Sequence, residues 1–262
     1  MIPEITFFGF PVETYTLMAA LAAVTFAAMS FWPLRRCGLP LWSVIILLVL
    51  ISAAFLVGAR LWNVAVNPDS YGENRPWYTL RMTGFSMYGG IAGAMTVLLF
   101  TALIARIRPM KILDAATIPG AAAFCTARIG CFLSGCCAGK ETDLPWGVRF
   151  PVDSDGLTSA VIHTPAVHPT QLYELVLALL GIPLCLLLVK KLRPGSGGRF
   201  FLYAAWFSTM RLVVHPLRVF PYSPLVTNIV YPLLYYVLIV HAVFLFIAAC
   251  RKNRRIGERK EL

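Results

Sequence analysis

The chain has 262 residues, of which 58% are hydrophobic and only 13% are charged. Soluble domains are typically about 45–50% apolar and about 25% charged, so this composition excludes an ordinary soluble protein and indicates an integral membrane protein. The net charge of +11 could suggest a nucleic-acid-binding protein, but the basic residues lie in short clusters between apolar runs, and we therefore expect no nucleic-acid partner.

The apolar runs predict about seven transmembrane helices, because a helix needs about 20 residues to cross the hydrocarbon of a bilayer. No polar block large enough for a second domain separates the runs. We therefore expect residues 1–262 to form a single integral-membrane domain, an all-α, polytopic membrane helical bundle. The predicted spans are residues 13–32, 42–64, 86–106, 112–133, 171–191, 199–216 and 226–250.

Lysine and arginine predict the orientation of this bundle. They gather after the first, third, fifth and seventh spans, in "RR", "RIRPMK", "KKLRPGSGGR" and "RKNRRIGERK". Loops rich in these residues face the cytoplasm, so we expect the N-terminus outside and the C-terminus in the cytoplasm. The N-terminal segment carries Glu4 and Glu13 and lacks a basic region, so we expect it to be retained rather than removed as a signal peptide.

Residues 134–170 are predicted to form an extracytoplasmic loop region. Pro145, Pro151 and Pro165 interrupt any helix there. The segment is also much longer than an ordinary connection, and long connections of this kind are often functional. We therefore expect this loop to contribute to a site.

Ionisable side chains lie near the predicted outer ends of four spans. Such groups are expensive in a bilayer and usually face the bundle interior or a wet cavity. A single arginine could snorkel to the interface, but a group at one depth favours a shared polar site. This group consists of Arg60, Arg128, His168, Glu174, Arg211 and His215.

The arginines of this group predict an anionic ligand. A guanidinium matches the oxygens of a phosphate, and the abundant phosphate of a bilayer belongs to lipid headgroups, so a phospholipid is the first ligand to consider. In "MYGG", Gly89 and Gly90 follow Tyr88 and would let a headgroup approach the backbone, although small residues also pack helices.

The segment "HPTQLYE" predicts a loop that enters the fifth span. His168 lies just ahead of the helix, Gln171 follows three residues later, and Glu174 lies about one turn beyond. Histidine is the side chain best suited to move a proton near neutral pH, whereas a histidine at the end of a loop is more often a structural hydrogen-bonding group. Both interpretations remain open for His168.

Three of the seven cysteines lie together in "TARIGCFLSGCCAGK", at Cys131, Cys136 and Cys137. Four interpretations compete. They could form a disulfide or a redox-sensitive pair, or they could simply pack among small residues. Arg128 could lower the pKa of a neighbouring thiol and make it a nucleophile. The fourth interpretation is a metal site that the cysteines form with His168 or His215, although the spacing of these residues matches no standard zinc pattern.

Several segments, in this order, are similar to one family. They are "GFPVETYTLM", "GARL", "FSMYGGIAG", "ILDAATIPGAAAFCTARIGCFLSG", "WGVRFP", "HPTQLYE" and "RLVVHPLR". Together they resemble the prolipoprotein diacylglyceryl transferase family of bacterial cytoplasmic (inner) membranes. The resemblance implies transfer of the diacylglyceryl group from phosphatidylglycerol or a related phospholipid to the cysteine thiol of a lipobox-bearing prolipoprotein, with release of glycerol phosphate. It also implies a multi-pass monomer without a cofactor or metal, whose site lies near the outer leaflet.

The resemblance also implies roles for individual residues. Arg128 and Arg211 match arginines thought to hold the phosphate, and Tyr15 matches a tyrosine near the active site. We predict catalytic roles for Arg128, Arg211, His168, His215, Tyr88 and Cys136. The residues expected to bind substrate are Tyr15, Arg60, Gly89, Gly90, Cys131, Ser134, Gly135, Gln171, Glu174 and Arg218. In this scheme His215 or His168 accepts the proton of the incoming acceptor.

The chain departs from the family pattern at three places. Tyr88 stands where the family has histidine, and His215 stands where it has glutamate. Cys131, Ser134, Gly135 and Cys136 replace an asparagine-rich "GNF…NGE" pattern. The departures favour a diverged member that keeps the phospholipid and changes the acceptor or the proton carrier. The alternatives are a catalytically altered phospholipid-binding or lipid-moving membrane protein and a membrane thiol redox protein.

Overall fold

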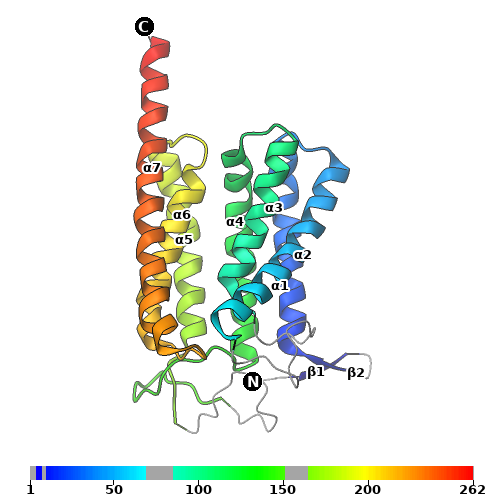
Figure 1. The fold of residues 1–262 in the computed structure, drawn as a ribbon, viewed down its shortest axis with the longest axis vertical. Helices are drawn as coiled ribbons and strands as arrows, with labels where there is room; N and C mark the ends of the chain where they lie inside the picture. Colours follow the sequence, from blue (N-terminus) through cyan, green and yellow to red (C-terminus); the bar gives the residue numbers. More distant parts are fainter. Residues whose placement is uncertain (1–3, 8–9, 69–84, 151–164, 262) are drawn as a thin grey trace.

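The computed structural model describes residues 4–7, 10–68, 85–150 and 165–261 (Figure 1). Its seven α-helices confirm the prediction of an all-helical bundle. They are α1 Thr14–Arg36, α2 Leu41–Val66, α3 Met87–Ile104, α4 Pro109–Leu133, α5 Thr170–Leu192, α6 Gly198–Val214 and α7 Tyr231–Glu261. A 3₁₀ turn (η2, His215–Leu217) follows α6, and a π-helical turn (η3, Val226–Val230) leads into α7.

A short antiparallel hairpin precedes the first helix. We did not predict this hairpin from the sequence. Its strands are β1 Glu4–Phe7 and β2 Phe10–Glu13, with Glu4 opposite Glu13 and Phe7 opposite Phe10. The hairpin leads directly into α1, so the first span begins at the end of a strand.

Six helical stretches in the described part of the chain are long and apolar enough to cross a membrane. These are α1 to α5 and the continuous stretch Val226–Asn253. The remaining helix, α6, has only 17 residues, fewer than the roughly 20 of a full span. The chain is therefore a multi-pass membrane protein, and α6 is shorter than a typical span.

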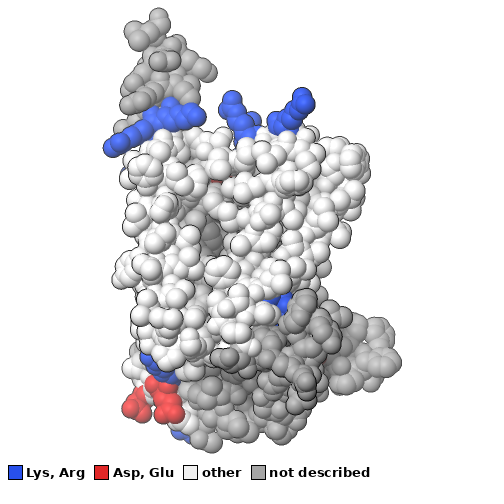
Figure 2. All heavy atoms as spheres, viewed as in Figure 1, with Lys and Arg blue, Asp and Glu red and all other residues white. Residues whose placement is uncertain are grey.

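The helices form two groups that lie side by side in Figure 1. In one group α2 packs against α3 and α1 packs against α4, and in the other α6 packs against both α5 and α7. Helix α4 also contacts α5 and α6 and so joins the two groups. The N-terminal hairpin and the end of α7 lie at opposite ends of the bundle, and Figure 2 shows a broad uncharged belt between charged ends.

Glycines bring α2 and α3 into close contact. A Cβ atom added at Gly58 would overlap the backbone of Gly89, and one added at Gly93 would overlap the backbone of Ala54. Helices in membranes associate closely where small residues allow their backbones to approach. These two helices therefore pack closely because glycines at their contact let the two backbones approach each other.

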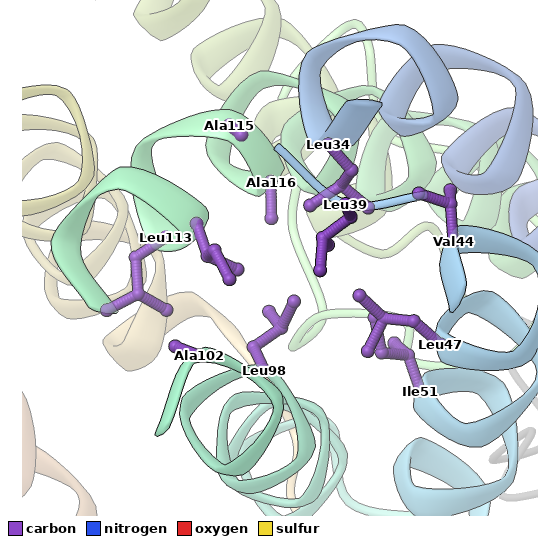
Figure 3. Packing of buried hydrophobic residues seen from close by; sticks show 11 residues of the cluster. Leu34, Leu39, Val44, Leu47, Ile51, Leu98, Ala102, Leu113, Ala115 and Ala116 are labelled. Carbon is purple, nitrogen blue, oxygen red and sulfur yellow. The ribbon is translucent and has the colours of Figure 1, made fainter. Parts of the chain in front are cut away.

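The end of the bundle near the basic clusters is held by a hydrophobic core and a polar cap. Figure 3 shows the core, in which Leu34, Leu47, Leu98 and Leu113 from four helices converge and are almost fully buried. Nearby, the Asp114 carboxylate accepts hydrogen bonds from the backbone N–H groups of residues 197 (2.7 Å) and 200 (2.9 Å). This satisfies N–H groups at the start of α6 that have no partner within the helix.

Candidate functional site

The opposite end of the bundle contains a buried carboxylate surrounded by three guanidinium groups. Glu174 Oε2 lies 2.7 Å from Arg128 Nε, and Glu174 Oε1 lies 2.5 Å from Arg211 Nη1 and 2.9 Å from Arg218 Nη1. The Glu174 side chain is 1% exposed and none of the three arginine side chains exceeds 8%. Four of the predicted site residues, Arg128 of α4, Glu174 of α5, Arg211 of α6 and Arg218 beyond it, therefore lie together in one cluster.

The directions of the helices explain why these residues meet. Arg128 lies in the last two turns of α4, Glu174 in the second turn of α5 and Arg211 in the last turn of α6. Helices α4 and α6 end where α5 begins (Figure 1), so the three residues lie at the same end of the bundle. Arg218 is placed by an isolated bridge to Gly139 in the loop that follows α4.

The charges of this cluster do not balance. Three guanidinium groups face one carboxylate, which leaves an excess of two positive charges in a buried setting. The buried Nε atoms of Arg211 and Arg218 also have no hydrogen-bond partner among the described residues. Buried donors and charges are costly unless they are paired. The arrangement is therefore suited to an additional anion with several oxygen atoms.

Glu174, which we predicted to be a substrate-binding residue, contacts arginines in the structure. Both of its oxygens bind guanidinium groups. The pairs fix three long, flexible side chains in one arrangement. Glu174 therefore organises the arginines.

An aromatic wall borders the arginine cluster. The guanidinium carbon of Arg211 lies 5.8 Å from the ring centroid of Tyr88, and the Tyr88 ring lies 5.7 Å from that of Tyr235 and 6.1 Å from that of Tyr231. The buried hydroxyl groups of Tyr88 and Tyr235 have no hydrogen-bond partner within the described ranges. The wall thus adds two hydroxyl groups beside Arg211 that can still donate a hydrogen bond.

His215 reaches the same wall and is held as one tautomer. Its Nε2 lies 2.8 Å from the carbonyl oxygen of Thr227, and its ring centroid lies 5.5 Å from that of Tyr235. A carbonyl oxygen only accepts, so Nε2 carries the proton and Nδ1 presents a lone pair. Nδ1 is buried and has no partner among the described residues. His215 therefore presents a free basic nitrogen.

The surroundings of His215 favour its neutral form. Burial has the largest effect and lowers the pKa of this imidazole. The Thr227 carbonyl opposes it, and the positive charges of Arg211, Arg218 and Lys140 lower the pKa further. A neutral imidazole can accept a proton at physiological pH. His215 is therefore available as a base.

The three clustered cysteines lie beside Arg128. The Sγ atoms of Cys131, Cys136 and Cys137 all lie within 4.8 Å of one another, and Arg128 Nη1 lies 3.7 Å from Cys131 Sγ. Hydrogen bonds from the other two thiols, with help from Arg218 and Arg128, hold the pKa of Cys137 well below its usual value. The thiols are free in the structure.

Of the other predicted residues, Tyr15 lies near the arginine cluster, whereas His168 and Arg60 make contacts with other side chains. Tyr15 lies close enough to Arg128 and to the three clustered cysteines to interact with them electrostatically. His168 instead contacts Tyr173, with 3.3 Å between Nδ1 and the hydroxyl oxygen. Arg60 lies over the ring of Phe85, at 4.3 Å from its centroid. None of the side-chain contacts seen in the described part of the chain joins His168 to the Glu174 cluster.

The remaining predicted residues have structural contacts. Gly89 packs against Gly58 and Gly90 packs against Phe55, so both belong to the α2 and α3 contact. Gln171 Nε2 donates to the Cys136 carbonyl oxygen at 2.7 Å. Roles for these residues in binding a headgroup remain predictions, as they do for Ser134 and Gly135.

Sequence reasoning missed Tyr231 and Tyr235, which complete the aromatic wall. Their spacing of four residues places both side chains on one face of α7, and that signal was present in "YPLLYY". Nothing in the sequence indicated that this face would meet Tyr88 of a distant helix.

Comparison with known proteins gives one consistent result. The model of the prolipoprotein diacylglyceryl transferase family matches residues 3–253. The chain is also similar to proteins that are named phosphatidylglycerol–prolipoprotein diacylglyceryl transferase, and three of them serve as examples. The protein of Tropheryma whipplei is 29% identical over 62% of this chain and 61% of its own length, and that of Dehalococcoides mccartyi is 28% identical over 79% and 78%. The protein of Clostridium tetani is 33% identical over 62% and 63%.

Proposed function

Because the chain belongs to the prolipoprotein diacylglyceryl transferase family, we propose that it transfers a diacylglyceryl group from phosphatidylglycerol to the cysteine thiol of a prolipoprotein. The chain spans about three fifths of the length of the Tropheryma whipplei and Clostridium tetani proteins, so the activity and both substrates are part of the proposal. The similar proteins carry that activity in their names.

The observation that carries the proposal is the excess positive charge around Glu174. Arg128, Arg211 and Arg218 are buried and bring two more positive charges than the carboxylate neutralises. A lipid phosphate supplies both the charge and the acceptor oxygens that this cluster lacks. The unpaired Nε atoms of Arg211 and Arg218 and the free hydroxyl of Tyr88 would donate to those oxygens.

The proposed reaction is a displacement at carbon. The acceptor thiol loses its proton to Nδ1 of His215, and the sulfur attacks the glyceryl carbon that bears the phosphate. The carbon–oxygen bond breaks, a carbon–sulfur bond forms, and the electron pair leaves with the oxygen of glycerol phosphate. Negative charge grows on the departing phosphate, and the arginines offset it. Donors aimed at developing charge usually make the largest contribution to such catalysis.

We propose that the site faces the outer leaflet of the bacterial cytoplasmic membrane. The cluster lies at the end of the bundle opposite Arg35 and Arg36 of α1 and Lys190 and Lys191 of α5. Basic residues favour the cytoplasmic side, so the cluster would lie on the other side, within reach of outer-leaflet headgroups.

Purified protein in phosphatidylglycerol bilayers, supplied with a lipobox peptide, tests the proposal. We expect the peptide thiol to gain the mass of a diacylglyceryl group and an equal amount of glycerol phosphate to be released. Arg128→Lys should abolish both, whereas the matched Arg199→Lys at the other end of the bundle should leave both unchanged, because Arg199 contacts the backbone of Asp114 there.

Two outcomes would contradict the proposal. Consumption of no phospholipid with any thiol, hydroxyl or amine acceptor would exclude a transferase. Saturable phospholipid binding without turnover, lost in Arg128→Lys, would identify a lipid-binding protein instead.

A further inference from the structure

The thiol cluster is built by a reversal of the chain at the end of α4. Cys131 lies in the last turn of this helix, and the chain then turns back so that Cys136 and Cys137 return to it. The turn uses two residues with positive φ, Gly135 at 73° and Cys137 at 62°. The left-handed region costs a residue with a side chain about 1–2 kcal/mol, so the conformation of Cys137 must be stabilised by its surroundings.

Two buried side chains of α5 hold this turn in place. Thr170 Oγ1 donates to the carbonyl oxygen of Cys137 at 2.9 Å, and Gln171 Nε2 donates to that of Cys136 at 2.7 Å. Thr170 and Gln171 are each 1% exposed. The backbone of both cysteines is therefore fixed from a neighbouring helix, and the three sulfur atoms remain close together.

We propose that Cys131, Cys136 and Cys137 bind one thiophilic divalent metal ion, Zn²⁺, through their three sulfur atoms. Zinc–sulfur bonds are about 2.3 Å long, which places the sulfur ligands of one ion about 4 Å apart. The Sγ atoms already lie within 4.8 Å of one another. A disulfide would use only two of these thiols, whereas a metal ion uses all three.

The charge around the cluster fits an anionic metal–thiolate complex. Three thiolates and one Zn²⁺ carry a net charge of one minus. Arg128 Nη1 lies 3.7 Å from Cys131 Sγ, and Arg128 belongs to the cluster whose guanidinium groups outnumber the carboxylate. A guanidinium group close to the sulfur atoms offsets the negative charge that such a complex carries. The arginine cluster and the complex therefore stabilise each other.

The three sulfurs leave one coordination position of a tetrahedral zinc ion open. We had considered His168 and His215 as partners of the cysteines, but among the described residues the ligand atoms that lie within 4.8 Å of one another are the three sulfur atoms alone. Water or a thiol can occupy the open position, as in zinc sites that keep three protein ligands. The inference does not depend on the proposed function, because it concerns only these thiols.

Metal titration of the reduced, full-length protein in detergent tests the inference. Zn²⁺ bound per chain is measured by elemental analysis, and Cd²⁺ serves as a second probe because cadmium–thiolate bonds absorb in the ultraviolet. We expect one ion per chain. Cys136→Ser should weaken binding at least about tenfold because it removes one of three thiolate ligands. Cys37→Ser and Cys250→Ser, which change cysteines outside the cluster, should leave binding unchanged.

A second measurement does not depend on the folding of a variant. Bound Zn²⁺ should protect the three clustered thiols of the unaltered protein from alkylation, as detected by mass spectrometry of its peptides, and should leave Cys37 and Cys250 as reactive as before. Binding of no ion by the reduced protein, equal binding by Cys136→Ser, or unchanged alkylation of the three thiols would each overturn the inference. None of these measurements uses a phospholipid or an acceptor peptide.

Discussion

Replacing Glu174 by glutamine keeps the shape of the side chain and removes the one negative charge that faces three arginines. The structure gives this carboxylate ion pairs at 2.7, 2.5 and 2.9 Å, all of them buried. Breaking one buried ion pair by removal of a partner typically costs about 3–5 kcal/mol, because a buried charge is left uncompensated. In Glu174→Gln three arginines lose their partner, so we expect the free energy of unfolding to fall by at least about 3 kcal/mol.

Titration with a denaturing detergent, followed by circular dichroism, measures this loss. The exposed Glu141 provides a matched control, and Glu141→Gln should stay within about 0.5 kcal/mol of the unaltered protein. If a lipid phosphate binds the same arginines, phosphatidylglycerol should stabilise Glu174→Gln more than it stabilises the unaltered protein. A Glu174→Gln protein as stable as the Glu141→Gln control would refute the view that this carboxylate organises the cluster.

Three further predictions follow from the site and the packing. Arg211→Lys should lower the rate of diacylglyceryl transfer about 10²–10³-fold, as loss of a donor to developing charge typically does, while Arg199→Lys should retain the full rate in the same mass-spectrometric assay. The transfer rate should rise with pH and reach half of its maximum below pH 6.5, because the pKa of His215 is lowered and the neutral form is the base; an unchanged pH profile in His215→Gln would contradict this role. Gly89→Ala should lower the thermal unfolding midpoint, because the new Cβ would overlap the backbone of α2, whereas Gly120→Ala, with open space around it, should leave the midpoint unchanged or raise it. Equal midpoints for the two glycine variants would contradict the packing argument.

The sequence was sufficient to predict the helical bundle and the meeting of several charged residues at one end of it. Long apolar runs have few alternatives in a membrane, so the α-helical bundle followed from length and composition. The convergence of Arg128, Glu174 and Arg211 followed from their positions near the ends of the predicted spans.

The pairing of side chains could not be predicted in the same way. Nothing in the sequence indicates that one carboxylate binds three arginines, because that depends on how α4, α5 and α6 pack. Gly89 is a similar case, since a glycine beside a polar residue suits either a ligand or a facing helix. Only the position of Gly58 across the contact distinguishes the two.

The pairing of Arg128 with Glu174 also has a consequence for the biogenesis of the protein. Helix α4 is the least apolar of the six candidate spans, and its buried arginine has its counter-charge on α5. At about 5–20 residues synthesised per second, Glu174 follows Arg128 by about 2–9 s. An arginine is unfavourable by about 2.5–3.5 kcal/mol at the centre of a membrane helix on insertion scales, and by less near its end. The arrival of α5 therefore makes the burial of Arg128 more favourable, because it supplies the counter-charge.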